Sequence, residues 1–245
     1  MSETNVELSP ASKKALDLLK SIGKCRMGTF INGHNGEPET IKCSKLYGKA
    51  PRLPDEDIHM CGECNAPNTL LVQLYVPSLP PNVQRILPAE LSDALLVFYY
   101  CLECLPYDKH PLDVKIYHAD EIEKLKYYDI ERDYNEDPMI FDSYTTALTF
   151  STEALWSNPT IKEMSNIGDI DEELNSKFHY NLRSKCYFGG CATFIQGDEN
   201  PGPEWELFLN LEEDECNHFM WGDCGTAQIW VHCSEPKFVL TWACC

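Results

Sequence analysis

The sequence predicts a mainly β fold (α+β), in which the strands of an antiparallel sheet outnumber a few peripheral helices. Two apolar runs, at 70–76 and 94–100, are rich in β-branched and aromatic residues and lie between Pro and Asn residues. Similar runs recur near the end of the chain, at 206–211 and 226–233. With 245 residues, 43% hydrophobic and 24% charged, the chain has an ordinary globular composition and can bury a large core.

A minority of helices is expected at the periphery. The clearest covers residues 10–22, where Ser9 serves as N-cap, Pro10 occupies the first helical position and the apolar residues share one face. A third strand is predicted at 114–118. The remaining expectations are helices at 121–125 and 159–177 and a long irregular, Pro-rich connection at 77–90.

The last third of the chain repeats the first half in the same order. The sequence SKLYG at 44–48 is echoed by SKCYFG at 184–189, and the run ending at Cys101 is matched by the run ending at Cys233. Such self-similarity is typical of duplicated units. We therefore predict one internally duplicated antiparallel β-sheet domain over residues 1–245, with halves at about 25–130 and 180–245.

Two CxxC pairs carry the strongest chemical signal in the sequence. The chain has 13 cysteines and no export signal, so the thiols are expected to be reduced, and clustered pairs then indicate a metal rather than disulfides. Four thiolates form the ligand set of a tetrahedral structural zinc. The predicted ligands of a Zn²⁺ ion are Cys61, Cys64, Cys101 and Cys104.

The two pairs are far apart in sequence, with 36 residues between Cys64 and Cys101. Cys64 lies just before the strand at 70–76 and Cys101 just after the strand at 94–100, so antiparallel pairing would bring both pairs to one end of a hairpin. The alternatives are small buried hydrophobes and a thioredoxin-like redox pair, although the βαβ context of the latter is missing. His59 is interpreted as a neighbour of the site rather than a ligand.

The charge of the chain restricts its partners. It carries 20 Lys and Arg against 39 Asp and Glu, a formal net charge of −19. Such a surface repels phosphate backbones, which argues against nucleic acid, and it attracts a basic protein or peptide. The alternative is that the charge only maintains solubility. Acidic stretches at 212–215 and 169–173 are expected in loops or at a helix edge, where they can meet Lys and Arg.

Membrane association is not expected. No apolar run reaches the roughly 18 residues of a membrane helix, and the polar, acidic start lacks the pattern of a secretory signal. The terminal Cys244-Cys245 pair matches a prenylation signature, but it follows the apolar run 238–242 rather than a flexible polar tail. A cytoplasmic protein is therefore predicted.

Several short motifs resemble a known family. Gly-Gly at 189–190, Ile-Gln at 195–196, Trp-Gly-Asp-Cys-Gly at 221–225 and the closing Trp-Ala-Cys-Cys look like the bacterial YwqG-like proteins, a domain of unknown function. The resemblance implies a mainly β, internally duplicated fold. It covers about residues 44–118 and 180–245, and it departs from the family at 47–51, where one glycine stands in place of a Gly-Gly-Pro-like turn.

The first half is also similar to the eukaryotic programmed-cell-death-protein-2 family, through CGEC at 61–64, LLVQLYVPSLP at 70–80 and VFYYCLEC at 97–104. These proteins have been grouped with the YwqG-like ones in one superfamily, although a separate MYND-type zinc finger is missing here. The resemblance implies a dedicated chaperone of a small-subunit ribosomal protein, a role that a shared fold alone does not establish.

Catalytic motifs are weak, so no catalytic residue is assigned and binding is favoured over catalysis. The cluster at 221–225 predicts a turn in which Gly222 and Gly225 supply conformational freedom. Its functional alternative is a hydrolase pocket formed by Asp223, His218 and a cysteine. The first hypothesis is a zinc-binding protein-interaction module, a holding chaperone for a basic, ribosomal-type protein; the second is this hydrolase.

Overall fold

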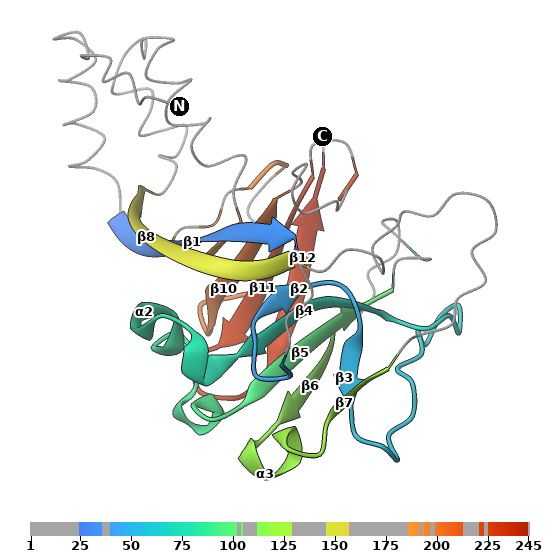
Figure 1. Cartoon of the computed structure of the whole chain (residues 1–245). Helices are drawn as coiled ribbons and strands as arrows, with labels where there is room; N and C mark the ends of the chain where they lie inside the picture. The colour runs from blue at the N-terminus through green and yellow to red at the C-terminus, as the bar shows by residue number, and fades with distance from the viewer. Residues whose placement is uncertain are drawn as a thin grey trace, which may run out of the picture.

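Ten strands form one large antiparallel sheet in the computed structural model (Figure 1). The structure describes residues 25–35, 40–101, 104, 112–128, 146–156, 186–190, 192, 194–196, 199–212, 221–222 and 225–244. The predicted helices at 10–22 and 159–177 lie outside these residues. Across the sheet the order is β12 (Phe238–Ala243), β11 (Thr226–His232), β10 (Trp205–Glu212), β9 (Tyr187–Gly189), β1 (Cys25–Asn35), β8 (Thr146–Trp156), β2 (Lys45–Leu46), β4 (Thr69–Tyr75), β5 (Leu95–Tyr100) and β6 (Asp113–Tyr117).

A second, two-stranded sheet pairs β3 (Ala50–Arg52) with β7 (Lys126–Tyr128). The described helical segments are short: η1 (Val76–Ser78), α2 (Pro81–Gln84), η2 (Ala89–Leu91) and α3 (Ala119–Ile122). None of the helices in the described part of the chain is long and apolar enough to cross a membrane. The mainly β, antiparallel fold class is confirmed.

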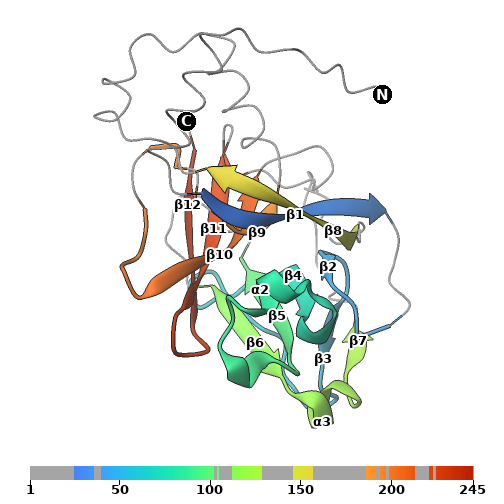
Figure 2. The ribbon, with the colours of Figure 1, turned by 90° about the vertical axis from the view of Figure 1, so that its left-hand side faces the viewer.

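The centre of the large sheet is the pair β1 and β8, whose eleven residues match one to one. Figures 1 and 2 show this pair lying across the molecule, with β10–β12 descending on one side and β4–β6 on the other. The two long strands connect the halves: β1 of the first half pairs with β9 of the second, and β8, which lies between the halves along the chain, pairs with β1 and with β2 of the first half.

The internal duplication is visible in the strand register. In β4 the ladder to β5 is interrupted between Leu70 and Val72, and in β10 the ladder to β11 is interrupted between Leu207 and Leu209. Such bulges bend a strand and raise its local twist. One bulge in each half, at the same place in the hairpin, supports the duplicated fold class.

The turn after the short strand of each half repeats as well. Tyr47 and Gly48 have φ values of 54° and 76°, and Gly189 and Gly190 have φ values of 64° and 73°. The left-handed conformation costs a residue with a side chain about 1–2 kcal/mol, so glycine is favoured at both positions. Tyr47 occupies this conformation with its ring buried in the core, which accounts for the single glycine in the first half.

The register also corrects one detail of the sequence comparison. Tyr99 lies opposite Leu70, and Trp230 lies opposite Leu207. The structural counterpart of Cys101 is consequently His232, so the match of Cys101 with Cys233 is wrong by one residue. The sequence alignment rests on the cysteine at the end of each run, whereas the structural alignment rests on the bulge that each half carries at the same place.

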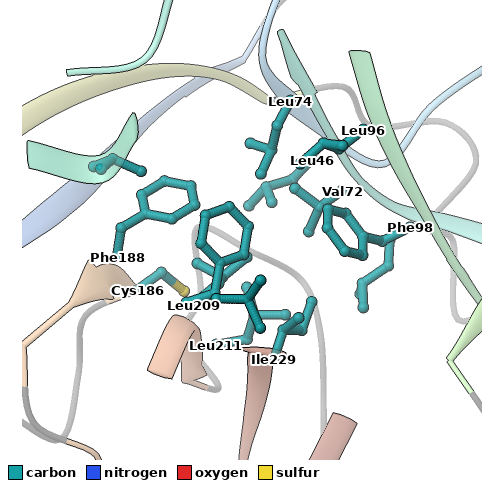
Figure 3. Packing of buried hydrophobic residues seen from close by; sticks show 14 of the residues in the cluster. Leu46, Val72, Leu74, Leu96, Phe98, Cys186, Phe188, Leu209, Leu211 and Ile229 are labelled. Carbon is teal, nitrogen blue, oxygen red and sulfur yellow. The ribbon is translucent and has the colours of Figure 1, made fainter. Parts of the chain in front are cut away.

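The two halves share one hydrophobic core. Figure 3 shows Val72, Leu96 and Phe98 of the first half pointing toward Leu209 and Ile229 of the second. The strands β4 and β5 are buried on both faces, since Leu70, Val97 and Tyr99 belong to a second cluster on the other side. Burial on both faces explains why these strands are continuous apolar runs in the sequence.

The connection 77–90 is not irregular, contrary to the prediction. Residues 76–91 contain η1, α2 and η2, and five apolar residues of this range lie in the shared core: Val76, Leu79, Val83, Leu87 and Leu91. Proline is tolerated in the first turn of a helix, because the N–H it lacks would have no intrahelical partner there. Prolines of this stretch, on which the irregular connection was predicted, therefore lie at the start of short helical turns, such as Pro81 in α2.

Candidate metal centre

The first CxxC pair lies in a small hairpin that precedes β4. Met60 and Pro67 form an isolated antiparallel bridge, and the Cys61 amide donates to the carbonyl of Ala66 at 2.8 Å. Asn65 closes the turn with φ = 58°, a left-handed conformation that Asn tolerates better than most residues. This local fold directs the cysteine side chains toward the end of the β4–β5 hairpin.

The second pair follows β5 directly, as the antiparallel pairing of β4 and β5 predicts. The Cys64 and Cys101 sulfurs are 3.5 Å apart, and the Cys61 and Cys104 sulfurs are 3.9 Å apart. All four sulfurs lie within 4.8 Å of one another. The structure thus brings together the four cysteines that the sequence selects, from two segments far apart along the chain.

These distances fit a metal tetrahedron. With zinc–sulfur bonds of about 2.3 Å, the sulfurs of a tetrahedral site stand roughly 3.8 Å apart, between the two separations above. A disulfide needs about 2.05 Å, so the cysteines are present as separate thiols. Four sulfur donors suit a soft or borderline ion such as Zn²⁺ and do not suit Mg²⁺ or Ca²⁺, which take oxygen.

The electrostatics of the cluster favour a cation. Burial opposes ionisation of Cys61, but the amides of Cys64 and Glu63 point at its sulfur and lower its pKa to about 6. Burial raises the pKa of Cys101 to about 11, and the nearby thiols, Cys64 foremost, raise the pKa of Cys104. Four thiolates repel one another unless a positive ion neutralises them, so metal binding would release protons.

His59 is a neighbour of the cluster and does not belong to it, as expected. Its Nδ1 lies 2.5 Å from the carboxylate of Asp113 in β6, and its ring stacks on Tyr99 of β5 at 4.7 Å. Through these contacts His59 fastens the CxxC hairpin to the strands that deliver the second cysteine pair.

Sequence analysis missed a second fastening point, Glu56. Its carboxylate is 3.0 Å from Lys115 Nζ and accepts a hydrogen bond from the Tyr117 hydroxyl at 2.7 Å. Burial would raise its pKa, but the bonds from Tyr117 and Lys115 prevail and lower the pKa to about 2. The stretch PDED at 54–57 looks like a solvated loop, and no periodicity marks one of its acids as paired.

The alternative pocket lies mostly outside the described residues, which include neither Asp223 nor His218. Of its surroundings, Trp221 is buried against Tyr100, with ring centroids 5.7 Å apart. Gly222 has φ = 98°, and a Cβ on Gly225 would lie 2.1 Å from the Trp221 carbonyl oxygen. These contacts fit the predicted turn.

Glu212 differs from its predicted position. It ends β10 and is 5% exposed, with its carboxylate accepting hydrogen bonds from Thr226 and Asn210. A buried carboxylate needs such partners, and the polar side chains that β10 and β11 place beside it supply them. Glu212 is therefore not an exposed acid, and residues 213–215 and 169–173 lie outside the described residues.

Comparison with known families assigns the chain to one of them. The family described as "Domain of unknown function (DUF1963)" matches residues 44–237, which include all four clustered cysteines and every described strand except β1 and β12. The chain belongs to this family. The result agrees with the resemblance to YwqG-like proteins, while the superfamily link to programmed-cell-death-protein-2 proteins stays a prediction. No curated protein matches the chain.

Proposed function

We propose that the chain is a zinc-binding protein-interaction module. The observation that carries the metal assignment is the approach of four cysteine sulfurs to within 4.8 Å of one another. Cys61, Cys64, Cys101 and Cys104 would hold one Zn²⁺ ion. Free thiols persist in a reducing compartment, which favours a cytoplasmic location.

The zinc is structural in this proposal. Catalytic zinc sites keep one position open for water or substrate, whereas four protein ligands fill a tetrahedral ion. Cys61 and Cys101 are also buried. The ion would join the hairpin before β4 to the segment after β5 and stabilise that end of the sheet.

The partner in this proposal is a basic protein or peptide, held in the manner of a chaperone for a ribosomal-type protein. Its support is the net charge of −19 and the resemblance to a superfamily with that role. Long-range attraction of this kind raises the association rate and is screened by salt.

Two measurements test the proposal. Protein expressed with added zinc should contain one zinc per chain by elemental analysis, and it should capture a basic protein from extract at low salt and release it at moderate salt. A Cys64→Ser/Cys104→Ser variant serves as the metal-free control. Absence of zinc would refute the metal assignment. Capture of no basic protein, together with turnover of a small molecule, would favour the hydrolase.

A further inference from the structure

Two large hydrophobic side chains among the described residues are exposed, Ile58 at 39% and Met60 at 44%. Both belong to residues 53–60, named here the acidic loop because it also carries Asp55, Glu56 and Asp57. The loop ends one residue before Cys61. Aliphatic and acidic side chains are thus displayed together beside the cysteine cluster.

The acidic loop is held from within at Glu56 and His59. Glu56 accepts a hydrogen bond from the Leu53 amide and contacts Lys115, and His59 contacts Asp113 and stacks on Tyr99. Ile58 lies between these two fixed residues, and Met60 lies between His59 and Cys61. Exposure of Ile58 and Met60 is therefore a property of an ordered surface, and an ordered surface loses little entropy on binding.

Open clefts flank the acidic loop on two sides. One, of about 780 Å³, is lined by Arg52, Pro54, Asp55, Glu56, Asp57, Ile58 and Met60. The other, of about 640 Å³, lies between the loop and elements β6 and α3, and Pro54, Asp55 and Glu56 line both. Along the loop, a peptide in the larger cleft would meet the carboxylates of Asp55 and Asp57 and then the apolar side chains of Ile58 and Met60.

We propose that the acidic loop is the docking surface for an extended peptide segment that combines Lys or Arg with aliphatic residues on one face. The inference rests on the proposed function and gives it a location. Charge complementarity selects the basic residues, because Asp55 and Asp57 are exposed and the chain as a whole is acidic. Ile58 and Met60 select the aliphatic residues, and the flexible, polarisable Met side chain suits a surface that accepts varied sequences.

The metal would control this surface. Met60 precedes Cys61 and is bridged to Pro67 across the CxxC hairpin, so an ion on the cysteines fixes the backbone on which Met60 is displayed. Loss of zinc should therefore weaken peptide binding even though the ion touches no peptide.

A fluorescein-labelled peptide of Lys-Lys-Val-Val repeats, in which each face of the extended chain carries both residue types, tests the proposal when it is titrated with the zinc-loaded protein and followed by anisotropy. We expect Ile58→Ser/Met60→Ser to weaken binding about tenfold or more, since apolar contact is lost. Asp55→Asn/Asp57→Asn should weaken binding at low salt and reduce its salt dependence. The same repeats with Ser in place of Val, or with Glu in place of Lys, should bind more weakly than the Lys–Val peptide.

The matched control neutralises two exposed acids that line neither cleft, Glu90→Gln/Glu204→Gln. Equal weakening by both acidic pairs would show that net charge alone attracts the peptide and would overturn the proposal. Unchanged binding by the Ile58/Met60 variant, with zinc content and urea midpoint also unchanged, would overturn it too. In either case a basic partner captured from extract leaves the proposed function standing, so the two failures are distinguishable.

Discussion

The two halves of the sheet share a strand plan but close their ends in different ways. In the second half, β11 and β12 are joined by residues 233–237, and the His232 amide donates to Lys237 at 3.0 Å. In the first half, β5 and β6 are separated by residues 101–112, and the cysteine cluster lies at that end. Backbone hydrogen bonds close the short hairpin, and the long one carries a candidate metal site.

Equivalent positions show the same contrast. His232, the counterpart of Cys101, packs edge-on against Trp205 with ring centroids 5.3 Å apart. The next amide, Cys233, donates to Glu204 at 2.9 Å. Ring packing and backbone bonding thus occupy in one half the place that four thiols occupy in the other. Duplication preserved the strands and left the ends free to diverge, which is where binding sites tend to lie.

The largest effect is expected from removing the thiols. Cys64→Ser/Cys104→Ser should lose zinc and lower the free energy of unfolding by roughly 3–5 kcal/mol, less than for a small zinc finger because the chain has a large core. Urea unfolding and elemental analysis measure both. Cys233→Ser, at an exposed cysteine of the other half, should change stability by no more than about 0.5 kcal/mol. Equal losses of stability in the two variants would mean that the cysteine cluster stabilises its half no more than Cys233 stabilises the other.

Chelation should affect the two halves differently without any mutation. When zinc is withdrawn, amides of β5 and β6 should lose hydrogen-exchange protection, because local opening follows the loss of local contacts. Amides of β11 and β12 should keep theirs. Uniform loss across both hairpins would contradict a local role of the ion.

Sequence reasoning located the strands that are buried on both faces and the four cysteines, because both leave short-range patterns. It could not identify β1 and β8, whose runs CRMGTFINGHN and TALTFSTEALW contain Gly, Asn and Thr. Their pairing joins residues more than 100 positions apart, and no local pattern encodes such a partner. The contact of His59 with Asp113, 54 positions away, was hidden for the same reason.

Two glycines sharpen the comparison further. Gly225→Ala, in the second half, should cost about 3 kcal/mol, since the new Cβ would lie 2.1 Å from the Trp221 oxygen and force the backbone to shift. Gly62→Ala, inside the CxxC pair, meets nothing within 4 Å and should leave zinc content and stability unchanged. Thermal unfolding of both variants checks this, and a large effect at Gly62 would show that the cysteine hairpin tolerates no added bulk.

The smallest effect concerns one ion pair in each half. The pKa of Glu56 is lowered from 4.5 to about 2, so its contribution to stability is complete above pH 4.5 and is lost as the pH falls toward 2. Glu56→Gln should therefore cost about 2 kcal/mol at pH 7, and the difference from wild type should fall to roughly half at pH 3. Acid would also release a metal held by the cysteine cluster, but it would do so from both proteins, so the difference between them isolates Glu56. Glu235, paired with Lys237 on the exposed β11–β12 turn, is the control, and Glu235→Gln should leave the urea midpoint unchanged at every pH because water screens exposed pairs. A pH-independent loss in Glu56→Gln would mean that Glu56 acts through packing and not through its charge.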